Sequence, residues 1–391
     1  MAQLRIPALY MRGGTSKGVF FIKDELPADP CERDRLLLRV IGSPDPYGKH
    51  TDGIGGATSS TSKVVILSRS AREDSDVDYL FGQVAIQSPV IDWSGNCGNL
   101  SAAVGPAAIA LSLVDAPDDG EALVRIWQAN IGKRIHARVQ MAGGEPVEEG
   151  SFKLDGVAFP AAEVPIEFLD PVSGDDEGGG MFPTGHAIQT LDLPDMGAIE
   201  VSMVNAGLPT VFIDAAALGL RGTELQPEVN GNAALLAHVE AIRSHCAVLM
   251  GLAATPQQAT CERPHTPKLC FVAPPAGYTA SDGREVQATS IDLLARVFSM
   301  GQLHHAMTGT GAVAIAVAAA LPGTVVHRAS TAASPARVRF GHPSGTLQVG
   351  AEVSQRDGRW VASKVVMSRS ARRLMEGWVR VPSPEDCSDG H

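Results

Sequence analysis

The chain has 391 residues, of which 44% are hydrophobic, and it carries a formal net charge of −11. This length and apolar content are sufficient for two hydrophobic cores, so we expect two domains. Because the charge is negative and long basic runs are lacking, nucleic acid and anionic membranes are excluded as expected partners.

The sequence shows no targeting signal, no membrane span and no metal-binding pattern. The N-terminus has no charged-then-apolar leader, and no stretch of about 18 apolar residues is present, which favours a cytoplasmic location. The six cysteines form no Cys-x-x-Cys pair and no spacing with histidine that suits zinc. We therefore expect free thiols and no bound metal.

The first informative segment, residues 11–21, is a glycine-rich turn between two strand-like stretches. It places Arg12 and Lys17 on a tight turn, and two neighbouring cations suit a bound carboxylate. We therefore predict a carboxylate clamp at this turn. The neighbouring residues that we assign to the same binding site are Gly13, Thr15 and Ser16.

A second glycine-rich segment, residues 52–63, contains three glycines and five hydroxyl side chains, ends in a lysine and is followed by an apolar strand-like run. It lacks the Gly-Lys-Ser/Thr order and the following helix of a phosphate loop. Its donors suit an anion, and Ser60 is our candidate among them. Lys63 is either a surface charge or, if it is desolvated, a general base, because burial lowers the pKa of a lysine.

A lone thiol, Cys97, lies between small and polar residues where an apolar helix begins. Residues 100–114 carry no charge, which predicts a buried helix of about four turns. A helix N-terminus favours anions, so this thiol is either a reactive group or a small buried cysteine in a turn. Its neighbours Asn96, Gly98 and Asn99 favour the reactive interpretation.

The middle of the chain is predicted more coarsely. Short β-rich runs alternate with turns, and strands are expected at residues 84–86, 123–127, 135–139 and 164–168. Residues 170–180 have the composition of an exposed connector, so we place a domain boundary there, with a long hairpin loop as the alternative. Apolar spacing predicts amphipathic helices at residues 233–249 and 291–300.

A second helix without charged residues is expected at residues 311–321, with Thr310 as its N-cap. It mirrors the helix that follows Cys97, and the preceding residues 307–311 align with residues 96–100. The two matching helices indicate a duplicated architecture.

Three further polar sites are candidates for substrate binding. Lys268 precedes an apolar strand-like run and is a second candidate cation. His304 and His305 precede the second helix, where a histidine either donates to a carboxylate or packs in the core or at the surface. Ser344 lies in a Gly-His-Pro-Ser-Gly turn that either binds a carboxylate or merely forms the turn.

Nine segments carry a family resemblance: residues 11–21, 52–63, 92–105, 125–132, 180–185, 265–268, 303–307, 341–347 and 368–372. In this order they closely resemble the PrpF family of 2-methylaconitate cis-trans isomerases, whose relatives include oxalomesaconate isomerases and tautomerases. The resemblance runs nearly end to end along the chain.

The resemblance implies the diaminopimelate-epimerase fold. This is an α/β fold of two similar domains, each a sheet wrapped around a central apolar helix, with the active site in the cleft between them. We place the N-terminal domain at residues 1–180 and the C-terminal domain at residues 181–374. The resemblance also implies that the last strands, at about residues 375–391, return to the first domain.

The lysine and cysteine that this family uses for catalysis fall on Lys63 and Cys97. The resemblance implies a cofactor-independent isomerase of an unsaturated tricarboxylate, 2-methylaconitate of the methylcitrate cycle, in which Lys63 removes an allylic proton. Cys97 is then an acid, a proton carrier or an oxyanion donor. The expected substrate-binding residues are Arg12, Gly13, Thr15, Ser16, Lys17, Ser60, Asn96, Gly98, Asn99, Lys268, His305, Met307, Thr308, Gly309 and Ser344.

One residue departs from the pattern of the racemases that share this fold. Thr308 stands where two-cysteine racemases carry their second thiol, and a hydroxyl is a poor acid or base at neutral pH, which counts against amino-acid racemisation. Two alternatives stay open: a 4-oxalomesaconate tautomerase or isomerase, and a non-catalytic partner of an aconitase-like iron–sulfur dehydratase. A functional link to such a dehydratase and a homo-oligomer also stay open.

Overall fold

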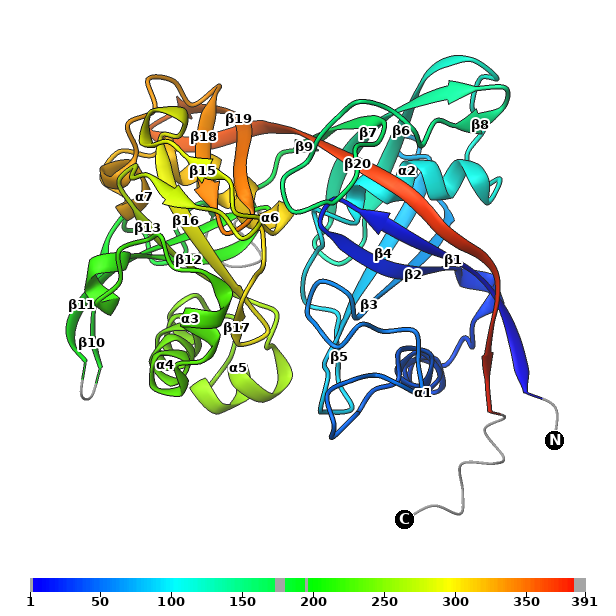
Figure 1. Ribbon diagram of the computed structural model, residues 1–391, viewed down its shortest axis with the longest axis horizontal. Helices are drawn as coiled ribbons and strands as arrows, with labels where there is room; N and C mark the ends of the chain where they lie inside the picture. Colours follow the sequence, from blue (N-terminus) through cyan, green and yellow to red (C-terminus); the bar gives the residue numbers. More distant parts are fainter. Residues whose placement is uncertain (1–2, 173–179, 194–195, 383–391) are drawn as a thin grey trace.

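The computed structural model describes residues 3–172, 180–193 and 196–382. The chain forms two lobes, each with a curved sheet and an apolar helix, as Figure 1 shows. Among these residues, no helix is both long and apolar enough to cross a membrane.

The N-terminal lobe is a sheet that curves around one helix, α2 (Ser101–Ala110). The helix α1 (Pro30–Ile41) packs on the outer face of this sheet through Leu37, Val40 and Ile41. The strands of this lobe are β1 (Leu4–Gly13), β2 (Ser16–Ile22), β3 (Lys63–Arg69), β4 (Val77–Val84), β5 (Ile91–Asp92), β6 (Gly120–Gln128), β7 (Lys133–Ala142), β8 (Glu145–Pro146) and β9 (Glu163–Leu169).

The C-terminal lobe repeats this plan around α6 (Gly309–Ala319), with α7 (Val325–Ala329) beside it. Its sheet strands are β10 (Gln189–Leu193), β11 (Gly197–Ala206), β12 (Leu208–Asp214), β13 (Lys268–Ala273), β16 (Leu293–Ser299), β17 (Gln302–Leu303), β18 (Val338–His342) and β19 (Gly345–Arg356). The remaining elements are α3 (Gln226–Asn230), α4 (Ala233–Leu249), α5 (Pro256–Glu262), the small hairpin β14 (Tyr278–Thr279) and β15 (Glu285–Val286), and the 3-10 turns η1 (Lys23–Glu25), η3 (Ala215–Leu218) and η4 (Ala288–Ser290).

One long strand, β20 (Arg359–Val381), joins the two lobes (Figure 1). Its first part pairs antiparallel with β19 of the C-terminal lobe, and its later part pairs with β9 and β1 of the N-terminal lobe. The register places Tyr10 opposite Met375 and Leu4 opposite Val381. Residues 375–381 therefore lie beside β1, whereas residues 383–391 are outside the described part, as are residues 173–179 of the expected connector.

The two central helices are buried because small apolar side chains cover all their faces. In α6, every residue from Gly309 to Ala318 is buried, and α2 is buried from Ser101 to Ala108. A side chain at Gly105 would meet Val139 of the surrounding sheet at 2.9 Å, so the small residue lets β7 approach the helix. Both helices belong to one hydrophobic core that continues across the lobes.

Most predicted elements are confirmed, and three are corrected. The strands predicted at residues 123–127, 135–139 and 164–168 are β6, β7 and β9. The strand predicted at residues 84–86 overlaps only the end of β4. The helix α4 has the predicted bounds. The first apolar helix ends at Ala110, before Val114, and the second begins at Gly309 instead of Gly311. The helix predicted at residues 291–300 is wrong, because this segment forms strand β16, buried on both faces between β13 and β18.

Candidate active site

Lys63 is the first residue of β3 and lies buried between strands. Its Nζ donates a hydrogen bond of 2.5 Å to Oε1 of Gln83, the residue opposite it on β4, and lies 5.0 Å from the centre of the Phe81 ring. Burial lowers the pKa of Lys63, because an ammonium loses its hydration there, and the nearby Cys97 opposes this shift. The shift is in the direction of the neutral amine, which is the form that accepts a proton.

Cys97 lies at the start of α2 and is 7% exposed. Its Sγ accepts a hydrogen bond from the backbone N–H of Leu100 at 3.5 Å, three residues later. Its carbonyl accepts from the backbone N–H of Ser101 at 3.0 Å and from the Tyr79 hydroxyl at 3.3 Å. The thiol thus accepts a backbone N–H in the turn that leads into α2, whereas the N-cap residue of this helix is Leu100, which makes no side-chain capping bond.

Thr308 lies directly before α6, whereas Cys97 lies four residues before α2, and each side chain accepts a hydrogen bond from the backbone N–H three residues later. Oγ1 of Thr308 accepts its hydrogen bond from the backbone N–H of Gly311 at 3.1 Å. Thr308 is therefore the N-cap of this helix, and the prediction that Thr310 caps it is wrong. Since Gly309 is already helical, the positive end of α6 lies two residues earlier than predicted.

The two helix N-termini face a small inner cavity of about 10 Å³, which has room for about one water molecule. Nine of the predicted site residues line it: Ser16, Lys63, Asn96, Cys97, Gly98, Asn99, Lys268, Thr308 and Gly309. His304, which the sequence analysis considered as a candidate donor together with His305, also lines the cavity, and three further lining residues were not predicted as site residues: His265, Ser299 and Thr310. The residues predicted from the sequence therefore include lining residues of the inner cavity from both lobes.

Asn96 is the buried polar group in this cavity that lacks a partner. It is 1% exposed, and neither its Oδ1 nor its Nδ2 forms a hydrogen bond with any described residue. A buried amide without partners costs free energy, so its donor and acceptor are free for a bound ligand. This observation supports Asn96 as a substrate-binding residue.

Asn99 connects the lobes. Its Nδ2 donates to Thr15 Oγ1 at 2.9 Å and to the carbonyl of Met307 at 3.0 Å. Its Oδ1 accepts from Nε of Arg369 at 3.1 Å. Arg369 is 1% exposed, and burial lowers its pKa to about 10 while Cys97 opposes the shift. The sequence analysis did not assign Arg369 to the site, although it lies in one of the segments that carry the resemblance.

Lys268 is the second lysine in the inner cavity. Its Nζ lies 3.0 Å from Nδ1 of His265 and donates to Oγ of Ser299 at 2.9 Å. His265 in turn has its backbone N–H bonded to Asp92 at 2.9 Å and its Nε2 at 3.3 Å from the carbonyl of Asn96. Asp92 and His265 thus link the wall that carries Lys268 to the turn that carries Cys97.

His304 and His305 stack on each other before α6, with ring centres 4.7 Å apart. Burial lowers the pKa of both imidazoles, which keeps them neutral at neutral pH. Nδ1 of His304 accepts a hydrogen bond from the backbone N–H of Ala306 at 3.1 Å, so its other nitrogen carries the proton and is a donor.

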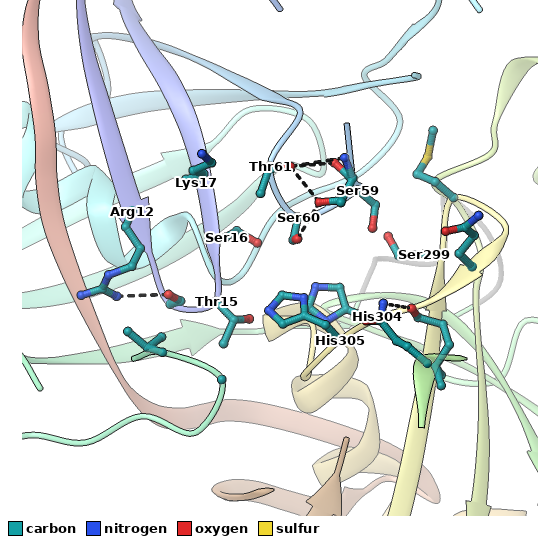
Figure 2. A pocket seen from close by; sticks show the side chains of 18 of the residues that line it. Arg12, Thr15, Ser16, Lys17, Ser59, Ser60, Thr61, Ser299, His304 and His305 are labelled. Carbon is teal, nitrogen blue, oxygen red and sulfur yellow. Dashed lines mark hydrogen bonds between the residues drawn. The ribbon is translucent and has the colours of Figure 1, made fainter. Parts of the chain in front are cut away.

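An outer pocket of about 620 Å³ opens beside the inner cavity (Figure 2). Ser16, Ser299 and His304 line both spaces, so they form the boundary between them. The predicted residues in the outer pocket are Arg12, Thr15, Ser16, Lys17, Ser60 and His305. Figure 2 shows the hydroxyl side chains of the N-terminal lobe opposite the two histidines of the C-terminal lobe.

The two cations of the predicted clamp are held at the outer pocket. Nη1 of Arg12 donates to the carbonyls of Gly14 at 3.1 Å and Ser370 at 3.0 Å, and Lys17 lies 5.2 Å from the Tyr10 ring. They occupy neighbouring positions across the β1–β2 hairpin. The outer pocket therefore carries positive charge although the whole chain is negative.

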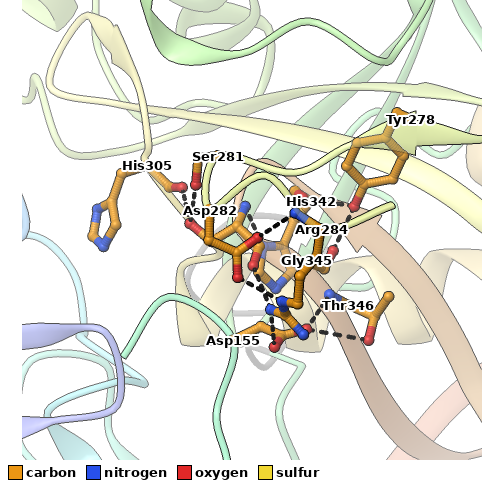
Figure 3. A network of polar contacts seen from close by, with 10 residues as sticks. Asp155, Tyr278, Ser281, Asp282, Arg284, His305, His342, Gly345 and Thr346 are labelled. Carbon is orange, nitrogen blue, oxygen red and sulfur yellow. Dashed lines mark hydrogen bonds and ion pairs between the residues drawn. The ribbon is translucent and has the colours of Figure 1, made fainter. Parts of the chain in front are cut away.

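Three predicted residues line neither the inner cavity nor the outer pocket. Gly13 packs where a side chain would meet the carbonyl of Asn99 at 2.7 Å, and Met307 is buried in the core. Ser344 donates to the carbonyl of His305 at 2.5 Å and belongs to the polar network in Figure 3, in which Asp155 pairs with Arg284 at 2.6 Å. That ion pair joins the loop after β8 to the C-terminal lobe.

Among the described residues, no group of three or more His, Cys, Asp or Glu side chains is arranged to hold a metal ion. The five cysteines in this part of the chain are free thiols, and Cys387 lies outside it.

Comparisons with known proteins show the family and the fold of the chain. The family model described as PrpF protein matches residues 3–382. A protein of Shewanella oneidensis named 2-methyl-aconitate isomerase is 57% identical over 390 residues, covering 98% of each chain. A crystal structure of a methylitaconate-delta-isomerase has a TM-score of 0.75 at 38% identity and covers 97% of this chain and 96% of the other.

A more distant structure confirms the predicted class of fold. A probable proline racemase of Agrobacterium radiobacter has a TM-score of 0.58 at 13% identity, covering 98% of this chain and 94% of the other. At that identity the likeness concerns the fold alone, which is the two-lobed racemase and epimerase fold. With the family model matched from residue 3 to residue 382, the chain belongs to the PrpF family.

Proposed function

We propose that this chain is an isomerase that converts the geometric isomers of 2-methylaconitate by allylic proton transfer. The observation that carries the proposal is the buried Lys63 amine, which faces one inner cavity together with Cys97 and two helix N-termini. The substrate is inferred from the relative that is 57% identical and named 2-methyl-aconitate isomerase.

The first step is proton removal by Lys63. The neutral amine takes a proton from a methylene carbon that is activated by a carboxylate and by the conjugated double bond. The C–H bond breaks, an N–H bond forms, and the electron pair spreads over a dienolate. Because the bond order of the original double bond falls, rotation about it becomes possible, and return of a proton gives the geometric isomer.

The negative charge that develops on the dienolate must be stabilised by hydrogen-bond donors that are in position before the reaction begins. The starts of α2 and α6 and the unpartnered amide of Asn96 supply them around the inner cavity. A well-placed donor to a developing oxyanion contributes about 3 kcal/mol to the stabilisation of a transition state. Cys97 stands beside these donors as an acid or as a further donor.

The substrate carboxylates fit the outer pocket. Arg12 and Lys17 lie there, and the buried Arg369 donates a hydrogen bond to Asn99, which lines the neighbouring inner cavity. The inner cavity holds only about one water molecule, so the boundary formed by Ser16, Ser299 and His304 must move for the reacting carbon to reach Lys63.

The direct test is activity of the purified protein on each candidate acid in deuterated water, followed by NMR. We expect interconversion of the 2-methylaconitate isomers with deuterium exchange at the allylic carbon. Turnover of 4-oxalomesaconate in place of 2-methylaconitate would assign the alternative substrate. Racemisation of an amino acid, or rescue of a pathway defect by the variant Lys63→Met, would contradict the proposed chemistry.

A further inference from the structure

The two lobes carry a matched pair of lysines. Lys63 begins β3, which runs parallel to β2, the second strand of the β1–β2 hairpin. Lys268 begins β13, which runs parallel to β12, the second strand of the β11–β12 hairpin. The duplicated fold therefore places an amine at the same topological position in each lobe.

The surroundings of the two lysines also match. Lys63 donates to Gln83 on the antiparallel neighbour β4, and Lys268 donates to Ser299 on the antiparallel neighbour β16. Each lobe then presents the start of its central helix to the same inner cavity. Lys268 has one additional partner, His265, whose Nδ1 lies 3.0 Å from its Nζ.

Two ammonium groups in so small a cavity repel each other. Lys63 is 4% exposed and Lys268 is 2% exposed. Burial, and then the charge of Lys63, lower the pKa of Lys268 to about 7. The charged or titratable groups that face Lys268 are Lys63 on β3, Cys97 before α2, Asp92 on β5, Arg243 on α4, and the neutral imidazoles of His265 and His304.

We propose that Lys268 is a second catalytic residue, which donates a proton to the dienolate while Lys63 acts as the base. The proposal rests on the proposed function, and its support is the shared cavity and the matched positions of the two lysines (Figure 1 shows β3 and β13 in opposite lobes). The His265 and Ser299 contacts hold the Lys268 amine at the cavity wall.

The proton balance of this scheme is complete. Lys63 starts neutral and takes the allylic proton, so a C–H bond breaks and an N–H bond forms. Lys268 holds the single proton that the two lysines share in this scheme and gives a proton to carbon, so an N–H bond breaks and a C–H bond forms. When the product leaves, Lys63 loses one proton to solvent and Lys268 gains one from solvent, which restores the starting state.

A single-turnover experiment in deuterated water distinguishes a mechanism with one catalytic lysine from a mechanism with two. We expect the wild-type enzyme to deliver solvent deuterium to the product, because the protons on Lys268 come from solvent. In Lys268→Met, Lys63 must return what it removed, so we expect part of the substrate's own hydrogen in the product and a kcat about a hundredfold lower. Equal labelling in the two enzymes, or a higher KM with unchanged kcat, would overturn the proposal and leave Lys268 as a binding cation.

The pH profile is a second readout that a purely structural role would not change. The charge of Lys63 helps to lower the pKa of Lys268 to about 7, so the lysine pair loses its first proton there and the singly protonated pair that the scheme needs forms above this pH. The wild-type kcat should therefore rise as the pH passes about 7, and Lys268→Met should lack this rise. The matched control is Cys270→Ala, two residues further along β13, which alters the strand without lining the cavity. A rise near pH 7 that persists in Lys268→Met would contradict the proposal.

A measurement on the wild-type protein covers the case in which Lys268→Met does not fold. Lysine side chains labelled with carbon-13 at Cε report their own titration by NMR, and Lys63→Met removes one of the two buried signals for assignment. We expect the Lys268 signal to titrate near pH 7, and an ammonium that persists to pH 10 would overturn the proposal. If the wild-type enzyme does not act on 2-methylaconitate at all, the proposed function fails, while this titration still tests Lys268.

Discussion

Gly98 and Gly309 touch each other through their backbones, and this contact brings the two helix N-termini together. A side chain on Gly98 would lie 2.7 Å from the carbonyl carbon of Gly309, and one on Gly309 would lie closer still to Gly98. Neither position leaves room for a Cβ atom, so the turn that leads into α2 and the first residue of α6 are in main-chain contact. The donors of both helices can therefore act on one small ligand.

The first prediction concerns this contact. Gly309→Ala should push the two helix starts apart, lower the free energy of unfolding by about 1 to 3 kcal/mol through overpacking, and reduce kcat more than the stability loss explains. Denaturant unfolding and steady-state kinetics measure the two effects. Gly277→Ala, where a Cβ would meet its nearest atom at 3.6 Å, is the control. Unchanged kcat in Gly309→Ala would show that the contact does not serve catalysis.

The second prediction separates the roles of Thr308 and Cys97. Thr308→Ala removes the hydrogen bond to the Gly311 N–H, so it should cost about 1 kcal/mol of stability and slow turnover less than about tenfold. Cys97→Ser should slow turnover more, because it replaces the thiol beside Lys63. Single-turnover kinetics on 2-methylaconitate compare the two variants. A Thr308→Ala enzyme as slow as Lys63→Met, or amino-acid racemisation by Thr308→Cys, would contradict our assignment of the chemistry.

The third prediction follows from the lowered pKa of Lys268. Its pKa falls from 10.5 to about 7 in the fold, so between these values the unfolded chain binds a proton that the folded chain has released. The free energy of unfolding should therefore rise with pH in this window, by at most about 1.4 kcal/mol per pH unit. Denaturant unfolding of the wild type and of Lys268→Met at several pH values isolates the contribution of this lysine. If the free energies of unfolding of the two proteins differed by the same amount at every pH in this window, Lys268 would have the same pKa in the folded and unfolded states, and the prediction would be wrong.

The sequence predicted the local parts of this molecule well. Charge-free runs identified both central helices, and the spacing of apolar residues gave α4 its bounds, because these patterns depend on nearby residues only. The same spacing was misleading at residues 291–300. Strand β16 is buried on both faces, so it lacks the alternation of a half-exposed strand, and its apolar residues also fit a helical period.

The parts of the site that could not be predicted are the contacts between segments far apart in the sequence. Arg369 reaches Asn99 from 270 residues away, and nothing in either local sequence reports that contact. The partners of Lys268 were hidden in the same way, since Ser299 becomes its neighbour only through the pairing of β13 with β16. Lys63 and Cys97 were chosen as candidates from their local surroundings and from the family resemblance, whereas their shared cavity is a property of the fold.

The measurement that tests the central claim most directly is the turnover of Lys63→Met on 2-methylaconitate in deuterated water. Methionine keeps the length of the side chain and removes the buried amine, so the fold should persist with equal or greater thermal stability. We predict that isomerisation and allylic deuterium exchange both fall by at least about a hundredfold, while the exposed control Lys23→Met keeps full activity. Isomerisation and exchange at near wild-type rates in a folded Lys63→Met protein would contradict the assignment of Lys63 as the base.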